Sequence, residues 1–280
     1  MLFRSQLILL GSGALLFCLI YFLGNTVPPK DPQKAKAAPS PDAIDFQQIL
    51  KSSKEQLTPL QLGYVSQLEA GVVKGDLPES QSRVYRKLAG FWKDTAHLLL
   101  PFSYYSGMAA KLENSEKSLT FAAHNFLEGL RRQSDPSLKK WMATEAKELF
   151  EKALKINPEN DSTKVGLGSC YLFGQISENP LTGIQLIREV ADRNPRNAYA
   201  QLMLGIGGLE SGQFDKAIER FNKVLAADPN QLEAILGLAE CYERKGDRSN
   251  AVKWYTEGRK YFTETEILQE IDARIELLKK

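Results

Sequence analysis

Hydrophobic and polar positions divide the chain into three stretches. Residues 5–24 form one apolar run without a charged residue, and residues 25–42 hold five prolines and almost no large apolar side chain. From residue 43 onward, apolar residues recur at the three- and four-residue spacing of helices, without convincing strand alternation. The pattern predicts an apolar helix, an extended linker and an all-α body.

The second half of the body repeats itself every 34 residues. Six pairs of like residues share this spacing: Pro195 and Pro229, Gly183 and Ala217, Ala217 and Ala251, Gly205 and Ala239, Gly212 and Gly246, and Phe221 and Tyr255. An earlier unit fits with a spacing of 37, which places the extra residues at a turn between Tyr171 and Gly183. A period of this length is typical of stacked helical units that bury a core only against their neighbours.

These residues resemble the tetratricopeptide repeat family. The best unit, residues 198–231, carries Leu204-Gly205, Ala217, Phe221 and Pro229 at the spacings of that family, and units near 161–197 and 232–263 share the pattern. The resemblance implies an α-solenoid of paired helices, in which small residues allow close approach. Gly212 and Gly246 are expected to end first helices in a left-handed conformation.

The repeats are predicted to fill residues 141–280 and to end in a capping helix over 264–280. Thr263 and Glu266 form a capping-box pattern before that helix. Within the helix, Glu270 and Arg274 have the four-residue spacing of an ion pair on its outer side.

Residues 43–140 are expected to be helical and in part a degenerate repeat. Leu77-Pro78-Glu79 predicts the start of a helix that ends near Leu100, and Pro101 marks a break after it. The first half of this region shows no assignable repeat.

The apolar run over 5–24 predicts a transmembrane anchor, because twenty residues span about 30 Å, the thickness of the hydrocarbon core. A cleaved signal peptide is the alternative, since Arg4 gives a short basic start, but no small-residue cleavage pattern follows. Residues 25–42 then form a flexible Pro/Lys/Ala-rich linker. The lysines of this linker favour a cytoplasmic body by charge. The very short N-terminal tail is instead typical of a signal anchor, and we expect a single-pass protein with its body on the exported, periplasm-like side.

Composition and chemistry narrow the function further. Lys and Arg total 36 against 34 for Asp and Glu, which leaves no basic excess for nucleic acid. The cysteines, Cys18, Cys170 and Cys241, show neither a disulfide framework nor metal-ligand spacing, and His97 and His124 lack ligand or catalytic partners nearby in sequence. The sequence therefore predicts no enzyme, cofactor or metal site.

The functional surface is expected to be a concave groove lined by the first helix of each unit. Helical spacing places these residues on that face: Val165, Tyr199, Leu202, Met203, Ile206, Leu209, Leu236, Glu240 and Arg244. An apolar middle and an acidic end suit a protein or peptide with apolar and basic residues. Alternatively, the same stripe packs against a neighbouring helix or a second copy of the chain.

The resemblance extends to bacterial single-pass tetratricopeptide repeat proteins. It implies a membrane-tethered protein-interaction scaffold that acts in envelope protein assembly or folding. Two alternatives stay open at this point: a homo-oligomeric structural protein, and a docking arm for a catalytic module in residues 43–140.

Overall fold

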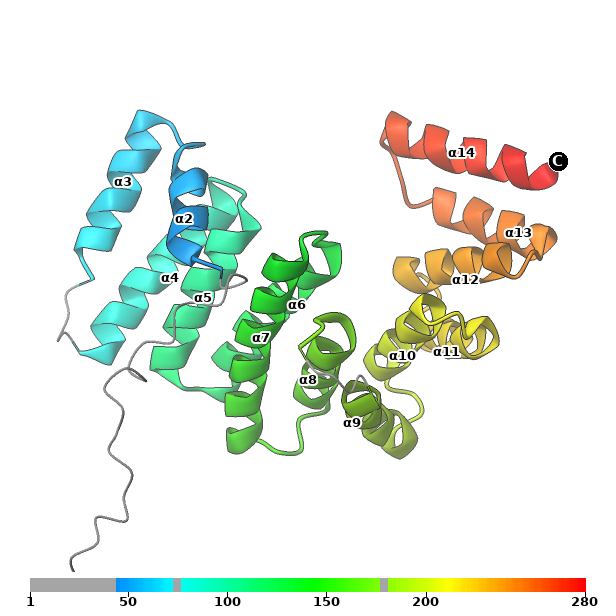
Figure 1. Cartoon of the computed structure of the whole chain (residues 1–280), viewed down its shortest axis with the longest axis horizontal. Coiled ribbons are helices and arrows are strands. Elements are labelled where there is room, and N and C mark those ends of the chain that lie inside the picture. The colour runs from blue at the N-terminus through cyan, green and yellow to red at the C-terminus, as the bar shows by residue number, and fades with distance from the viewer. Residues whose placement is uncertain (1–43, 73–76, 177–180) are drawn as a thin grey trace, which may run out of the picture. The chain divides into compact units, whose positions relative to one another are not determined.

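A computed structural model describes residues 44–72, 77–176 and 181–280, and within these ranges the chain forms helices and turns without strands (Figure 1). The predicted anchor over 5–24 and linker over 25–42 lie outside the described residues. The helices are α2 (Phe46–Lys54), α3 (Pro59–Ala70), α4 (Pro78–Asp94), α5 (Leu99–Glu113), α6 (Glu116–Arg132), α7 (Pro136–Ile156), α8 (Asp161–Phe173), α9 (Leu181–Arg193), α10 (Ala198–Glu210), α11 (Phe214–Ala227), α12 (Leu232–Arg244), α13 (Arg248–Arg259) and α14 (Thr265–Lys279). None of these helices combines the length and apolar character that crossing a bilayer requires.

Most of the helices form consecutive pairs. The closest packing joins α4 with α5, α6 with α7, α8 with α9, α10 with α11, and α12 with α13. The second helix of each pair then packs against the first helix of the next, and the first helices α6, α8, α10 and α12 also contact one another in turn. This is the arrangement of a helical repeat stack, so the predicted all-α fold of paired helices is confirmed for the described residues.

Large residues on second helices fit against glycines on the following first helices. A Cβ added to Gly166 on α8 would lie 2.3 Å from Cζ of Phe150 on α7, and one added to Gly237 on α12 would lie 2.5 Å from Cζ of Phe221 on α11. Both phenylalanines are fully buried. The ring therefore occupies the space that a side chain would otherwise fill, and consecutive pairs interlock.

The turns between pairs repeat one hydrogen-bonding pattern. Asn157, Asn194 and Asp228 each accept, through the side chain, the backbone N–H two residues later, at 3.3, 3.2 and 3.1 Å. Three residues beyond each of them stands the residue that caps the next first helix: Asn160, Asn197 and Gln231. A side-chain oxygen of each capping residue accepts a first-turn N–H that has no acceptor within the helix.

Glycine ends two first helices as predicted. Gly212 and Gly246 have φ values of +74° and +78°, a conformation that costs other residues a steric penalty.

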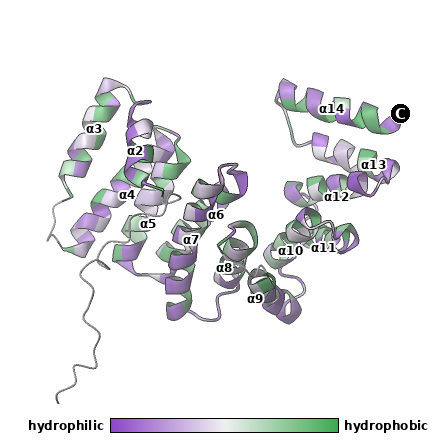
Figure 2. Cartoon of the chain, viewed as in Figure 1, coloured by the Kyte–Doolittle hydropathy of each residue, from purple (hydrophilic) through white to green (hydrophobic). Residues whose placement is uncertain are grey.

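The predicted capping box before α14 is wrong. The residue that caps this helix is Glu264, which makes no side-chain capping bond, and its carboxylate instead accepts the backbone N–H of Thr263 at 3.1 Å. The apolar stripe of α14 is present, and Figure 2 shows its hydrophobic and hydrophilic bands in alternation. Ile275 is the buried residue of that stripe.

Two boundaries differ from those expected upstream. Helix α7 runs unbroken from Pro136, so the division predicted between residues 140 and 141 falls inside it. Helix α4 ends at Asp94 rather than near Leu100, and Pro101 lies in the first turn of α5. Proline is tolerated there because first-turn N–H groups have no acceptor within the helix.

Helix α2 is attached through buried side chains that include Phe46 and Leu50. The ring of Phe46 stacks on Tyr104 at 3.8 Å between centroids and on Trp141 at 5.3 Å. Lys54 at the end of α2 pairs with Glu69 of α3 at 2.5 Å. These contacts join the N-terminal helices to the first pairs of the stack.

Candidate functional site

The predicted groove belongs to a surface that we call the inner face, formed by α6, α8, α10, α12 and α14. Helix α14 takes part because Glu270 and Arg274 lie 34 residues after Leu236 and Glu240, and the side chain of Arg274 pairs with Glu243 of α12. The last helix therefore occupies the position of another first helix, and its charged residues extend the face.

The predicted groove residues fall into two groups. Val165, Leu202, Met203, Ile206 and Leu209 are at most 8% exposed and belong to the main core. Tyr199, Leu236 and Glu240 are half-buried, and Arg244 is exposed. The first helices pack directly on one another, so the apolar residues of the stripe fill helix–helix contacts. These five apolar side chains do not line an open groove, which corrects that part of the sequence interpretation.

A charged pair that the sequence did not predict connects two first helices, α6 and α12, that lie three pairs apart in the stack. Arg131, on the last turn of α6, donates hydrogen bonds to both carboxylate oxygens of Glu233 on α12, and the bond from Nη1 to Oε2 measures 3.4 Å. The Arg131 guanidinium carbon also lies 5.9 Å from the ring centroid of Phe173 on α8. Burial lowers the pKa of this guanidinium from its ordinary value. A residue from α6, one from α8 and one from α12 thus meet on the inner face.

Tyr199 lies beside a half-buried histidine. Its ring is 5.6 Å from the ring of His124 on α6, and Nε2 of His124 is 3.1 Å from the hydroxyl oxygen of Ser162 on α8. Burial lowers the pKa of His124, so the neutral imidazole is favoured. Ser162, Tyr199 and Glu233 occupy the same position in consecutive units, at spacings of 37 and 34.

The predicted acidic end is a hollow of about 450 Å³ between α12, α13 and α14. Glu240 pairs with Arg244 on the same helix, while Glu243 pairs with Arg274 and accepts the hydroxyl hydrogen of Tyr255 at 2.7 Å. Arg274 therefore binds a carboxylate of another helix instead of the predicted Glu270. Glu270 lines the hollow without an ion-pair partner among the described residues.

Carboxylates outnumber cations on the inner face. Near the hollow and the Arg131 pair, the face carries the carboxylates of Glu210, Glu233, Glu240, Glu243 and Glu270 and the guanidinium groups of Arg131, Arg244 and Arg274, a formal charge of −2. Burial raises the pKa of Glu210, and the positive charges of Lys139 and Arg131 oppose this shift. No described residue forms a hydrogen bond or an ion pair with the Glu210 carboxylate.

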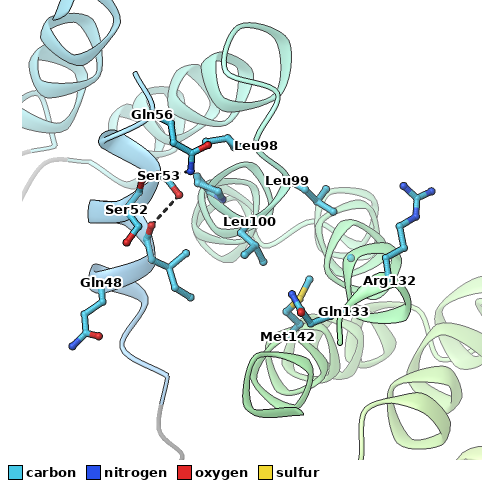
Figure 3. A pocket seen from close by; sticks show the side chains of 13 residues that line it. Gln48, Ser52, Ser53, Gln56, Leu98, Leu99, Leu100, Arg132, Gln133 and Met142 are labelled. Atoms are coloured by element: carbon cyan, nitrogen blue, oxygen red, sulfur yellow. Dashed lines mark hydrogen bonds between the residues drawn. The ribbon is translucent and has the colours of Figure 1, made fainter. Parts of the chain in front are cut away.

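A larger hollow, of about 630 Å³, lies away from the predicted residues, between α2, α5, α6 and α7. Figure 3 shows Leu98, Leu99 and Leu100 between α2 on one side and Met142 on the other. Amides of Gln48, Gln56 and Gln133 and the guanidinium of Arg132 surround this apolar floor. No sequence pattern predicted this hollow, because α2 lies outside the repeat pattern.

Within the described part of the chain, no group of three or more His, Cys, Asp or Glu residues is placed to hold a metal ion. Cys170 and Cys241 are free and buried, and burial raises the pKa of both thiols, that of Cys241 to about 11. Thiols with a raised pKa are poor nucleophiles at neutral pH.

Comparison with known proteins identifies the repeats. Tetratricopeptide repeat models match residues 208–274 and 142–160. A curated relative, interferon-induced protein with tetratricopeptide repeats 3 of Mus musculus, is 23% identical over 108 residues, which is 39% of this chain and only 27% of the relative.

Similar solved structures include YrrB, described as a tetratricopeptide repeat protein with an unusual peptide-binding site, at 19% identity and a TM-score of 0.42 over 69% of this chain and 92% of that one. Another is MamA from Desulfovibrio magneticus RS-1, at 21% identity and a TM-score of 0.44 over 64% of this chain and 93% of that one. On the two model matches, residues 142–160 and 208–274 of this chain are tetratricopeptide repeats.

Proposed function

We propose that this chain is a membrane-tethered scaffold that binds a segment of a partner protein on its inner face. Tetratricopeptide repeats stack into extended surfaces that bind proteins and peptides, and function lies in the residues of such a surface. The observation that carries the proposal is the charged hollow between α12 and α14, which continues the surface that carries Glu240 and Arg244. The hollow itself has a formal charge of −1, from Glu240, Glu243 and Glu270 against Arg244 and Arg274, and this favours a partner segment with basic residues.

The tether is the apolar run over 5–24, joined to the body by the proline-rich linker over 25–42. The proposed setting is envelope protein assembly or folding, with the body on the exported side. Alkaline extraction of membranes and protease protection of intact cells test the tether and its orientation. Release of the chain by alkali would contradict the membrane tether. Protection of the body on the cytoplasmic side would contradict the proposed orientation.

Photo-crosslinking tests the binding face. A photoreactive amino acid at Arg244, which is exposed on the inner face, should capture a partner in cells. The matched control is Asn222, which is exposed on α11 and not on the inner face. Equal capture from both positions, or capture from Asn222 alone, would refute the inner face as the binding surface.

Self-association is a second candidate, favoured by α3. Leu60, Leu62 and Tyr64 on this helix are 86%, 39% and 48% exposed, and Leu60 and Tyr64 line a hollow of about 580 Å³ together with Phe91. Large exposed apolar residues close together often mark interfaces. Light scattering of the full chain in detergent tests this, since a dimer that Leu60→Asp converts to monomer would support it. A wild-type chain that is already monomeric would exclude it.

A further inference from the structure

The Arg131 guanidinium is enclosed more than any other arginine in an ion pair of the described residues. Its side chain is 27% exposed, whereas the others range from 42% to 77%. Two contacts surround it, a carboxylate at its edge (Glu233) and an aromatic ring 5.9 Å away (Phe173), and the hydroxyl of Tyr199 interacts with its charge from farther away. A carboxylate beside aromatic rings is a favourable environment for a planar guanidinium, which binds bidentately and stacks.

The other groups of this environment come from α8, α10 and α12, while the arginine comes from α6, the first helix of the inner face. Glu233 and Tyr199 occupy equivalent positions in consecutive units, and Phe173 ends the first helix of the unit before them. Arg131 reaches them from the last turn of α6, 102 residues before Glu233 in the chain. The inner face thus contains a guanidinium site that the chain fills with its own side chain.

Charge decides which partner of the pair an incoming group would replace. The surrounding face has a formal charge of −2, so it repels an acidic segment that would replace Glu233 and attracts a basic one that would replace Arg131. A displaced Arg131 also has a destination. Its charge already interacts favourably with the carboxylate of Glu210, which has no ion-pair partner among the described residues, and with Glu128 one turn earlier on α6.

We infer that Glu233, Phe173 and Tyr199 form a binding site for an arginine side chain of the partner, and that Arg131 occupies this site when no partner is bound. This inference rests on the proposed function and adds a residue type and a position to it. Arg131 is a competitor for the site: the partner binds by displacing it, and Arg131 then pairs with Glu210. Arginine is preferred over lysine because only the guanidinium is planar and binds both carboxylate oxygens.

Two variants that break the same ion pair test this inference, because they are expected to change the affinity for an arginine peptide in opposite directions. Arg131→Gln removes the internal competitor and should tighten arginine-peptide binding about tenfold, the change expected if Arg131 fills the site about nine-tenths of the time. Glu233→Gln removes the carboxylate and should weaken binding about tenfold or more. Because each variant loses the same pair, a purely structural role would move both in one direction. Arg132→Gln and Glu219→Gln are the matched controls, since both remove an exposed charge paired within its own helix.

The probe is a fluorescent amphipathic peptide of leucine and arginine, measured by anisotropy with the full chain in nanodiscs. Three control peptides have the same sequence with each arginine replaced by lysine, by neutral citrulline or by glutamate. The expected order of affinity is arginine, then lysine, then citrulline. Tighter binding of the glutamate peptide, variants that shift together, or no arginine-peptide binding to either wild type or Arg131→Gln would overturn the inference. If crosslinking from Arg244 captures a partner equally in wild type and both variants, the proposed function stands and the arginine site alone fails.

Discussion

Gly237 offers a direct test of the interlocking between pairs. Replacing this glycine by alanine adds a Cβ within 2.5, 2.7 and 2.9 Å of three ring atoms of Phe221. The ring is fully buried and also lies close to Gly205, where an added Cβ would be 2.7 Å from one of its atoms, so it has little room to move. Either the ring or the backbone of α12 must therefore move.

The size of the effect follows from two opposing terms. Overpacking a buried contact costs about 1–3 kcal/mol. Alanine in a helix is favoured over glycine by about 1 kcal/mol. Gly63, on α3, isolates the second term because a Cβ there would meet nothing within 4 Å. Gly63→Ala should therefore raise stability by about 0.5–1 kcal/mol, while Gly237→Ala should lower it by up to about 2 kcal/mol.

The measurement is thermal unfolding followed by far-ultraviolet circular dichroism. For a body of this size, 1 kcal/mol moves the midpoint by about 2–4 °C, so the two variants should separate by several degrees in opposite directions. A double variant with Phe221→Leu relieves the contact, and the added alanine should cost less in that background than in wild type. If Gly237→Ala stabilises as much as Gly63→Ala, the ring is not confined and the interlocking argument fails.

Three further perturbations test other features. Burial lowers the pKa of His124 below its ordinary 6.5, so as the pH falls through that value the unfolded chain takes up a proton before the folded one. The free energy of unfolding should therefore fall by at most about 1.4 kcal/mol per pH unit. Denaturant titrations should show this loss between about pH 7 and pH 5 in wild type and less of it in His124→Gln, and equal dependence on pH in both proteins would contradict it. Gly212→Ala places a Cβ at a φ of +74° and should cost about 1 kcal/mol, in contrast to the gain at Gly63, and a gain at both would argue against a left-handed requirement. Phe46→Ala should speed hydrogen exchange in α2 without lowering the melting temperature of the repeats, and a cooperative loss of both would mean that α2 is part of the stack.

The parts of the fold that repeat were predictable from sequence, because one packing solution is used at each period. Gly212 and Gly246 illustrate this, since both adopt the left-handed conformation that their spacing suggested. The turns carried a further signal that was missed. Asn157, Asn194 and Asp228 share the spacing of the units, and Asn or Asp two residues before a backbone donor is a known turn former.

Local rules failed where a tertiary contact or a neighbouring turn decided the outcome. Pro101 suggested the end of a helix, but the chain turns earlier, at His97 with a φ of +55°, and the proline then falls in the first turn of α5. Arg274 has the spacing to pair with Glu270, yet it pairs with Glu243 because α12 lies beside α14.

The inner face was harder to predict than the helices. Helical spacing correctly put Leu202 and Ile206 on one side of α10, but their exposure depends on how closely the adjacent first helices approach. Both residues are at most 8% exposed in this arrangement. The contact between Arg131 and Glu233 was out of reach for a different reason. It depends on the rotation of one pair against the next, summed over the three steps between four consecutive pairs, and no single repeat encodes that sum.

The same packing rule that holds the stack together accounts for where the charged hollow opens. Residues 16 positions apart face each other across successive pairs, and Phe150 with Gly166 and Phe221 with Gly237 each combine a large ring with no side chain. In the intervening unit, Ile187 takes the place of the phenylalanine and Met203 the place of the glycine. Ile187 is smaller than phenylalanine, and both side chains are buried. At the last interface the rule breaks, because Tyr255 meets a position filled by Ile271. Tyr255 and Ile271 both stay half-buried, unlike Ile187 and Met203, and both line the hollow between α12, α13 and α14. The interface after the last full repeat is therefore filled less completely than the earlier ones, at the open, charged end of the inner face on which the proposed function depends.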